Sequence, residues 1–520
     1  MRTFALQYVI FFFVLTISWG CQKEVENRPP NIILFFVDDL GWQDTSVPFW
    51  KEETAFNKRY HTPNMERLAV QGMKFTQAYA TPVCSPSRIS LMTGMNAARH
   101  RVTNWTLRKD QIQPMEKNHE YLDFPFWNVN GLSMDSTLAH SVYATPLPTV
   151  LQQAGYRTIH VGKAHLGAIG TAAENPSNIG FDVNIAGHAA GAPKSYLGED
   201  HFGNLAEFKD SPWPVPGLEK YHGKEIFLTE ALTREAIAAL DESLAKEQAF
   251  FLYMSLYGVH TPIMADQRFI EKYYAQGLDS TEAKYASMIE AMDKSLGDLM
   301  DYLDEKQIAE ETIILFMADN GGLSAVARGG ERHTHNKPLS SGKGSIHEGG
   351  IREPMLVKWP GVTKANSTNS NYLIIEDFYP SILEMAGIEN YTSVQQIDGQ
   401  SFVAQLQQPK ESSSERALYW HYPNAWGPTG PGIGSFSAVR QGEWKLIYYH
   451  QEERFELFNL ATDIGETTNL ATIETEKLRA LAERMSEYLS EVDAQMPSHK
   501  STGELVRSPL EAAMFFTETH

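Results

Sequence analysis

Four apolar runs that each stop abruptly at polar residues constrain the fold of this chain more than any other feature. They cover residues 32–37, 156–161, 250–256 and 312–318. Runs that are apolar without alternation and rich in strand formers are typical of parallel strands buried on both faces. Helical patterns are expected between them, at residues 147–154, 230–246 and 283–306. The sequence therefore predicts an α/β fold with a large mixed, mostly parallel sheet sandwiched by helices.

The pattern changes beyond Asp398. Short strand-like runs follow at residues 418–421, 435–439, 444–449 and 455–458, and a helix is expected from 476 to 492. Such runs favour a short antiparallel sheet within a smaller C-terminal α+β subdomain. We therefore predict a main domain over residues 28–398, the subdomain over 399–494 and a polar tail over 495–520.

Composition limits the possible partners. A chain of 520 residues can bury a large core, and its formal net charge of −20 argues against nucleic acid, since phosphate backbones bind to basic surfaces. The same charge repels an anionic substrate at long range, so a site for an anion must concentrate a few cations in one pocket. With Cys21 and Cys84 as its two cysteines, the chain has no disulfide framework.

The N-terminus reads as an export signal. Residues 4–19 form a largely apolar run behind Arg2, long enough for a signal-peptide core and short for a membrane span. The run ends before Cys21 and resembles a bacterial lipoprotein signal, although Ser18 stands where leucine is usual. We expect residues 1–21 to be a signal peptide and the protein to be exported, periplasmic or anchored to the outer membrane of a bacterium through lipid on Cys21. The alternative is an ordinary cleaved signal with an incidental cysteine.

Polar residues follow the four apolar runs at the point where each ends. Asp38 and Asp39 follow the first run, Lys163 and His165 the second, His260 the third, and Asp319 and Asn320 the fourth. Open α/β sheets place their ligands at the carboxyl ends of the strands, so these side chains are expected at one edge. Adjacent buried carboxylates need a cation or hydrogen-bond donors to neutralise them, and we favour a hard divalent cation, which takes oxygen ligands. A solvated turn is the alternative for each pair taken alone.

A second constellation surrounds Cys84. The segment Cys84-Ser85-Pro86-Ser87-Arg88 suits the opening of a helix, because proline is tolerated in a first turn and serine can cap free amides. A cysteine at a helix N-terminus lies where negative charge is stabilised. On this segment alone, a nucleophile and an ordinary buried cysteine stay equally open.

Residues 84–94 resemble the type I sulfatase signature, C-x-P-S-R followed by a short helix that ends in T-G. Four further segments agree with that family in the same order: residues 155–167, 260–262, 319–322 and 342–354. One departure is Ala164, where an aromatic residue is usual. On this resemblance the chain is identified as a member of the formylglycine-dependent, arylsulfatase-like enzymes of the alkaline phosphatase superfamily.

The resemblance implies chemistry that the residues alone do not. In that family the cysteine is oxidised to formylglycine, whose hydrated aldehyde is the nucleophile; this implies a modified Cys84 and a formylglycine-generating enzyme as a partner. One calcium ion is expected, with ligands Asp38, Asp39, Asp319, Asn320 and an oxygen of residue 84. The remaining implied roles are Arg88 for holding the aldehyde, Lys163 and Lys343 for sulfate oxygens, and His165, His260 and Asp319 for proton transfer.

The substrate expected from this resemblance is a sulfate ester, and we expect it to be on a sulfated carbohydrate. Residues 101–141 are irregular and aromatic, and they either wall a sugar pocket or pack the loop onto the body. Two other functions stay open: a phosphoryl-transfer hydrolase of the same superfamily, and a surface glycan-binding lipoprotein without turnover. Cys84 and a single evident oxygen cage argue against the first, and the retained chemical groups argue against the second.

Overall fold

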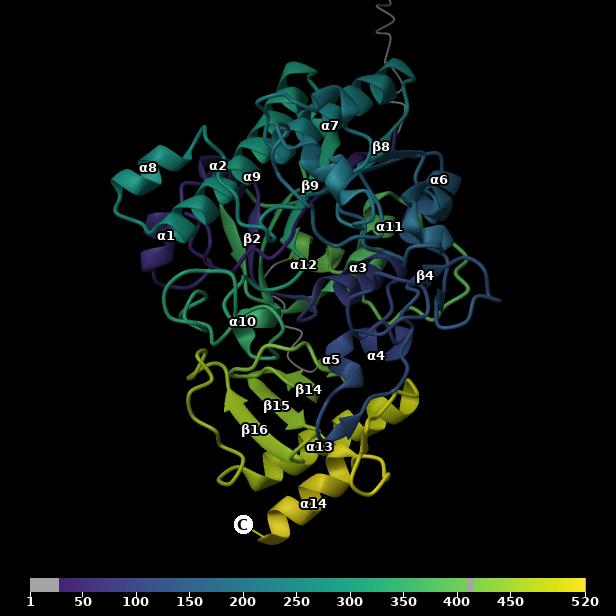
Figure 1. The fold of residues 1–520 in the computed structure, drawn as a ribbon, viewed down its shortest axis with the longest axis vertical. Helices are drawn as coiled ribbons and strands as arrows, with labels where there is room; N and C mark the ends of the chain where they lie inside the picture. The colour runs from purple at the N-terminus through teal and green to yellow at the C-terminus, as the bar shows by residue number, and fades with distance from the viewer. Residues whose placement is uncertain (1–27, 409–415, 520) are drawn as a thin grey trace, which may run out of the picture.

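The computed structural model describes residues 28–408 and 416–519 (Figure 1). The expected signal peptide and Cys21 lie outside the described residues. Among the described helices, none combines the length and the apolar composition that crossing a bilayer requires.

A nine-stranded sheet forms the centre of the main domain. Its strands are, in spatial order, β11 (Ser367–Asn369), β2 (Met73–Tyr79), β10 (Arg352–Lys358), β9 (Thr312–Ala318), β1 (Asn31–Val37), β8 (Phe250–Ser255), β6 (Arg157–Gly162) and β7 (Val183–Ile185), with β12 (Leu373–Ile374) paired to β2. All neighbours pair in parallel except β10, which runs antiparallel to β9 and β2. The predicted mixed, mostly parallel sheet is confirmed.

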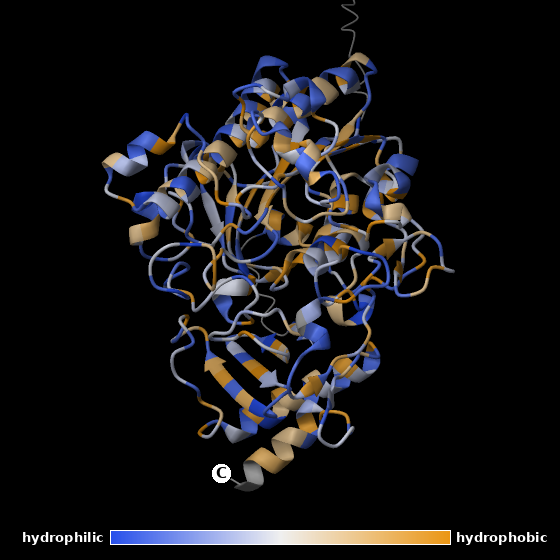
Figure 2. Cartoon of the chain, in the orientation of Figure 1, coloured by the Kyte–Doolittle hydropathy of each residue, from blue (hydrophilic) through white to orange (hydrophobic). Residues whose placement is uncertain are grey.

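Helices cover both faces of this sheet. Along β1, Ile32, Leu34 and Phe36 join one apolar core, whereas the alternate residues join the other. The first core is closed by α3 (Cys84–Thr93), α6 (Leu147–Gln153), α11 (Phe378–Met385) and α12 (Val403–Gln407), and the second by α2 (Pro63–Gln71), α7 (Leu228–Ala245) and α9 (Ser280–Glu305). Figure 2 shows the apolar strands enclosed by helices with polar outer faces. The sandwich explains why the core strands are apolar without alternation.

The C-terminal part forms a separate antiparallel sheet below the main one in Figure 1. Its order is β13 (Ala417–Tyr422), β14 (Phe436–Gln441), β15 (Trp444–Tyr449) and β16 (Arg454–Asn459), and α13 (Thr475–Glu491) packs on it. The predicted C-terminal sheet and helix are therefore present.

The tail is more structured than the sequence predicted. Helix α14 (Pro509–Thr519) lies against α13 and buries Ala512 and Ala513, and β17 (Ser498–His499) pairs with β3 (Leu122–Asp123). The apolar stretch at residues 510–516 is short and flanked by polar residues, so the sequence pattern did not indicate a helix there. Apart from short 3-10 helices, the remaining described elements are α1 (Ala55–Arg59), α4 (Ala97–His100), α5 (Pro114–Lys117), α8 (Ile270–Ala275), α10 (Glu348–Ile351), β4 (Leu132–Ser133) and β5 (Val142–Tyr143).

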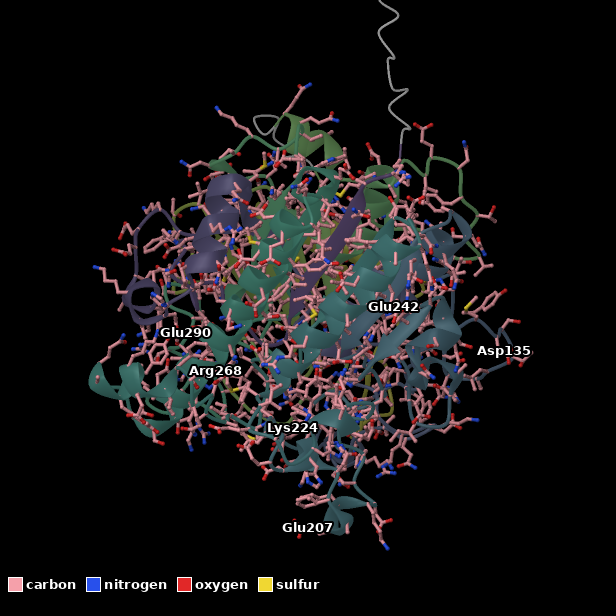
Figure 3. All side chains as sticks on the ribbon, turned by 90° about the horizontal axis from the view of Figure 1, so that it is seen from above. Asp135, Glu207, Lys224, Glu242, Arg268 and Glu290 are labelled. Carbon is pink, nitrogen blue, oxygen red and sulfur yellow. The ribbon has the colours of Figure 1, made fainter. Side chains whose placement is uncertain are left out.

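Charged side chains such as Asp135 and Glu207 lie at the outer edge of the molecule (Figure 3). A different group of charges is fully buried where the C-terminal sheet meets the main domain. Lys445 Nζ lies 3.0 Å from Glu348 Oε1 and 2.8 Å from Glu466 Oε1. These contacts tie β15 to α10, the helix that follows the Lys343 segment, so they help to fix the subdomain beside the strand ends.

We expect Lys445→Met to lower the free energy of unfolding by about 3–5 kcal/mol, because it removes the buried cation that Glu348 and Glu466 share. Burial alone would raise the pKa of Glu348, but Lys445 and Arg352 outweigh it and hold the pKa at about 2. The stabilisation from Glu348 is therefore present above its ordinary pKa of 4.5 and lost as the pH falls toward 2. Denaturant unfolding measured from neutral to acid pH checks both statements.

The matched control is Lys51→Met. Lys51 pairs with Glu52 at 3.9 Å on the surface, where an ion pair contributes about 0–1 kcal/mol. Equal losses in the two variants would contradict a buried, stabilising cluster.

Candidate active site

The polar residues that follow the core strands meet at one edge of the sheet. Because β1, β6, β8 and β9 are parallel, their carboxyl ends point the same way. The segments after them bring together Asp38, Asp39, Lys163, His165, His260, Asp319 and Asn320, while Cys84 opens helix α3 beside them. The sequence analysis predicts this convergence because the residues follow directly after runs expected to be parallel strands.

Three carboxylates form the centre of the site. Asp38, Asp39 and Asp319 are fully buried, and one oxygen of each lies within 4.8 Å of the others. Asn320 Nδ2 donates to Asp39 Oδ1 at 2.7 Å, which orients the amide toward the cluster. Asp38 Oδ1 and Asn320 Oδ1 are buried without a hydrogen-bond partner among the described residues. Unpartnered buried oxygens beside carboxylates are the donor set that a hard cation prefers, so these residues fit one.

Three cations balance these carboxylates. Lys163 Nζ lies 2.6 Å from Asp38 Oδ2, Lys343 Nζ lies 2.7 Å from Asp39 Oδ1, and Arg88 Nη2 lies 2.8 Å from Asp319 Oδ2. Burial alone would raise the pKa of Asp39, but Lys343, His260 and Lys163 bring it to about 2. Burial likewise acts to lower the pKa of Lys343, and the carboxylate of Asp39 outweighs it. Each of the three carboxylates thus has a cationic partner, although burial still raises the pKa of Asp38 well above its ordinary value.

Arg88 and Lys163 lie beneath the site and have no exposed surface. Arg88 Nη1 donates to Ser255 Oγ at 2.6 Å and to the Lys163 carbonyl at 3.1 Å. It therefore joins helix α3 to the ends of β6 and β8, and through Asp319 to the end of β9. In this structure both side chains contact carboxylates, and neither lines the pocket described below.

Cys84 and His165 face one another. The Sγ atom lies 3.4 Å from His165 Nδ1, and His165 Nε2 lies 2.8 Å from the Thr106 carbonyl. A carbonyl accepts only, so Nε2 carries the proton and Nδ1 presents its lone pair to residue 84. Burial, followed by Lys163, lowers the pKa of His165 well below its ordinary value. His165 is thus a neutral base aimed at Cys84.

His260 has the opposite arrangement. Its Nδ1 lies 2.8 Å from the Thr261 carbonyl, so that nitrogen donates, while Nε2 lies 3.7 Å from Asp39 Oδ2. Burial and then Lys343 lower its pKa to about 3. An anion bound beside Lys343 would offset that lysine and raise the pKa of His260. His260 can then hold a proton on the side that faces the pocket.

These groups open into a cavity of about 290 Å³, which we call the inner pocket. Cys84, His165, His260 and Lys343 line its polar side. Three tryptophans, Trp105, Trp213 and Trp426, also line it, together with smaller apolar residues. Flat aromatic walls above a small polar floor suit the apolar faces of a sugar ring whose charged substituent points inward.

One expectation about the Cys84 segment needs correction. The serines of the Cys84 segment do not cap helix α3, because its N-cap is Val83 without a side-chain bond. Ser85 Oγ instead accepts from Thr106 N and Ser87 Oγ from Thr81 N, so both tie the helix to neighbouring loops. The aromatic insert, residues 101–141, both lines the pocket and packs onto the body of the domain. Trp105 lines the pocket, whereas Trp127 is buried in the core.

Sequence reasoning missed Trp213, Trp426 and Thr106. Trp213 stands between two prolines and Trp426 precedes Gly427 and Pro428, which makes each an ordered aromatic in a loop. This pattern identifies the two tryptophans as candidate binding residues, but it does not show that they line the same pocket. The Thr106 carbonyl that fixes His165 has no signal in the sequence.

Comparison with known proteins gives consistent matches. A family model described as Sulfatase matches residues 30–388, and one described as N-sulphoglucosamine sulphohydrolase, C-terminal, matches residues 342–495. A protein named Sulfatase from Formosa agariphila is 30% identical over 501 residues, covering 86% of this chain and 85% of that protein. N-acetylgalactosamine-6-sulfatase from Homo sapiens is 28% identical over 506 residues, covering 91% and 87%.

Solved structures agree with these relatives. The crystal structure of Ps i-CgsB in complex with k-i-k-neocarrahexaose has a TM-score of 0.70 and 25% sequence identity to this chain. The match covers 94% of this chain and 98% of that one. The similarity therefore includes both the main domain and the C-terminal sheet.

Proposed function

This chain belongs to the sulfatase family, type I, whose members are sulfuric ester hydrolases, and from that premise we propose that it removes sulfate from carbohydrate esters through a formylglycine made from Cys84 and a calcium ion. The observation that carries this proposal is the position of Cys84. Its Sγ lies 3.4 Å from His165 Nδ1 at the floor of the inner pocket, beside the carboxylate cluster.

Formylglycine fits this position better than the thiol does. A cysteine thiolate could attack sulfur, but its adduct has no easy route to release. The hydrated aldehyde supplies two hydroxyls on one carbon, one for attack and one for the expulsion of sulfate. The N-terminus of α3 and Lys343 favour negative charge at residue 84 during both steps.

Calcium fits the oxygen cluster. Asp38, Asp39, Asp319 and Asn320 would hold it, together with an oxygen of modified residue 84. The unpartnered oxygens of Asp38 and Asn320 support this assignment. When bound, the ion would supply Lewis-acid stabilisation of charge on the sulfate.

The remaining residues either transfer protons or stabilise negative charge. Asp319, held by Arg88, assists deprotonation of the attacking hydroxyl. His260 protonates the leaving oxygen from Nε2, and His165 takes the proton from the second hydroxyl at Nδ1. Lys343, on the pocket wall, and Lys163, beneath it, stabilise the sulfate oxygens, and Arg88 holds residue 84 in place.

A sulfated carbohydrate is the substrate class that we propose. The three indole walls of the inner pocket suit sugar rings, and relatives named N-acetylgalactosamine-6-sulfatase and a neighbour solved with neocarrahexaose point the same way. We propose export through residues 1–21, with lipid on Cys21 and maturation of Cys84 by a formylglycine-generating enzyme. We propose residues 28–398 as the catalytic domain, 399–494 as the subdomain and 495–520 as the tail.

The experiment that tests the function measures the mass of tryptic peptide 75–88 from protein made in its natural cells. An aldehyde at residue 84, with sulfate released from a panel of sulfated sugars, is the expected result. An intact thiol would contradict the proposed chemistry, and phosphate release from phosphate esters without sulfate release would favour the phosphoryl-transfer alternative.

We expect His165→Ala to turn over 4-nitrophenyl sulfate once and then stall. The first step does not need His165, but release of sulfate needs a base at Nδ1, so the steady-state rate should fall about 100-fold or more. Stopped-flow absorbance should show a burst of about one nitrophenolate per active site.

His260→Ala is the contrasting variant. Nitrophenolate leaves without a proton whereas a sugar alkoxide does not, so this change should cost far more with sugar sulfates than with 4-nitrophenyl sulfate. Equal losses on both substrates would argue against His260 as the acid.

A further inference from the structure

A second cavity of about 690 Å³, which we call the outer pocket, lies next to the inner pocket. Its lining includes Tyr121 from the aromatic insert, and Tyr449, Gln451 and Arg454 from the C-terminal sheet and its turn. Trp426 and Pro428 line both pockets. The two cavities are therefore neighbours on either side of one loop, and a ligand longer than one ring can reach from one to the other.

The wall between the pockets is fixed in place. Gly344 has a φ of +85°, and a Cβ on it would overlap the indole of Trp426. Only glycine lets that ring pack on the backbone directly after Lys343. The indole thus stands immediately beside the cation of the inner pocket.

Hydrogen bonds hold the loop that carries Trp426 from both sides. Ile346 N donates to the Gly432 carbonyl at 2.9 Å, and Ser345 Oγ donates to the Pro431 carbonyl at 2.8 Å. On the other side, Asn424 Nδ2 donates to Thr103 Oγ1 at 2.7 Å. The relative position of the two pockets is therefore a built feature of the fold.

The outer pocket has the chemistry of a neutral sugar subsite. The side chain of Tyr121 is 52% exposed and offers a stacking face, and Gln451 offers hydrogen bonds. Arg454 is already engaged, with Nη1 2.6 Å from Glu456 Oε1 and its guanidinium stacked on Tyr449. Glu120 and Glu452 are exposed in the same lining and would repel a second sulfate.

We propose that the substrate is an oligosaccharide that spans both pockets, with its sulfated unit in the inner pocket and an unsulfated unit in the outer pocket, across Trp426. This inference rests on the proposed function and extends it. It makes Tyr121 and Trp426 determinants of chain-length specificity, because they contact the unit that does not react.

The test compares kcat/KM for 4-nitrophenyl sulfate, sulfated monosaccharides, and size-defined neocarrageenan oligosaccharides in which the sulfated unit is joined to an uncharged, unsulfated one. The wild-type protein should prefer at least one oligosaccharide over the matching smallest sugar. Tyr121→Ala should lower the ratio of oligosaccharide to 4-nitrophenyl sulfate efficiency by about tenfold, the value of one lost stacking contact. Tyr143→Ala, which removes a tyrosine that is 46% exposed and lines neither pocket, should leave the ratio unchanged.

Hydrolysis of small sulfate esters without any gain from chain length would overturn this inference and leave the proposed function intact. A ratio that is unaffected by Tyr121→Ala, or a preference for oligosaccharides sulfated on both units, would also overturn it. Absence of sulfate release from every ester would overturn the proposed function itself.

Discussion

Replacing Cys84 by alanine is expected to lower kcat/KM for sulfate ester hydrolysis by roughly four orders of magnitude or more, the loss typical of removing a covalent nucleophile. The side chain lies at the floor of the inner pocket, 3.4 Å from the base His165. Alanine cannot be oxidised to the aldehyde, so both hydroxyls of the proposed mechanism are lost. Sulfate release measured by ion chromatography checks the prediction.

A matched control separates chemistry from folding. Ser90→Ala also deletes one buried heavy atom from helix α3, but Ser90 bonds to His100 and does not line the pocket. Both variants should keep the thermal unfolding temperature within a few degrees, because each removes little buried volume. Retained sulfatase activity in folded Cys84→Ala protein would rule out the proposed nucleophile, and retained glycan binding without any wild-type turnover would favour the binding-protein alternative.

Removal of the proposed calcium ion is the second change expected to abolish turnover. The ligands proposed for it are all protein oxygens in a buried cluster, an arrangement that suits calcium better than magnesium, which keeps more of its water. Chelation with EGTA should therefore stop sulfate release, and calcium should restore it more fully than magnesium. Activity titrated against free calcium measures this dependence.

Stability should respond less than activity does. Asp38, Asp39 and Asp319 each have a cationic partner in Lys163, Lys343 or Arg88, so the fold does not depend on the ion alone to offset these charges. Loss of calcium should cost only its binding free energy, about 3 kcal/mol at a concentration about a hundred times Kd. Global unfolding on chelation would contradict this charge balance.

A variant pair locates the ion. Asp38→Asn keeps the shape of the side chain but removes a charge. It should raise the calcium concentration that gives half-maximal activity by about tenfold or more. Asp266→Asn changes an equally buried aspartate that pairs with Arg268 outside the site, and it should leave the calcium dependence unaltered. If the two variants shift the calcium titration alike, the cluster does not bind the ion.

The sequence by itself determined the four core strands and the chemistry of the residues at their ends. The apolar runs fixed the core strands, because a continuous run without alternation is stable only when both faces are buried. The end of each run then fixed where Asp38, Lys163, His260 and Asp319 would lie, since parallel strands bring their carboxyl ends to one edge. Local patterns were sufficient to predict these strands and the residues that follow them, because strand length, helix period and short motifs are properties of short segments.

Only the tertiary structure decided how distant segments meet. Trp105, Trp213 and Trp426 come from three loops that share no local pattern, and they form one pocket only because the insert and the C-terminal sheet pack over the strand ends. The proton positions on His165 depend on a carbonyl at Thr106, far away in the sequence. Such contacts are set by long-range packing, which leaves no signature in the residues that make them.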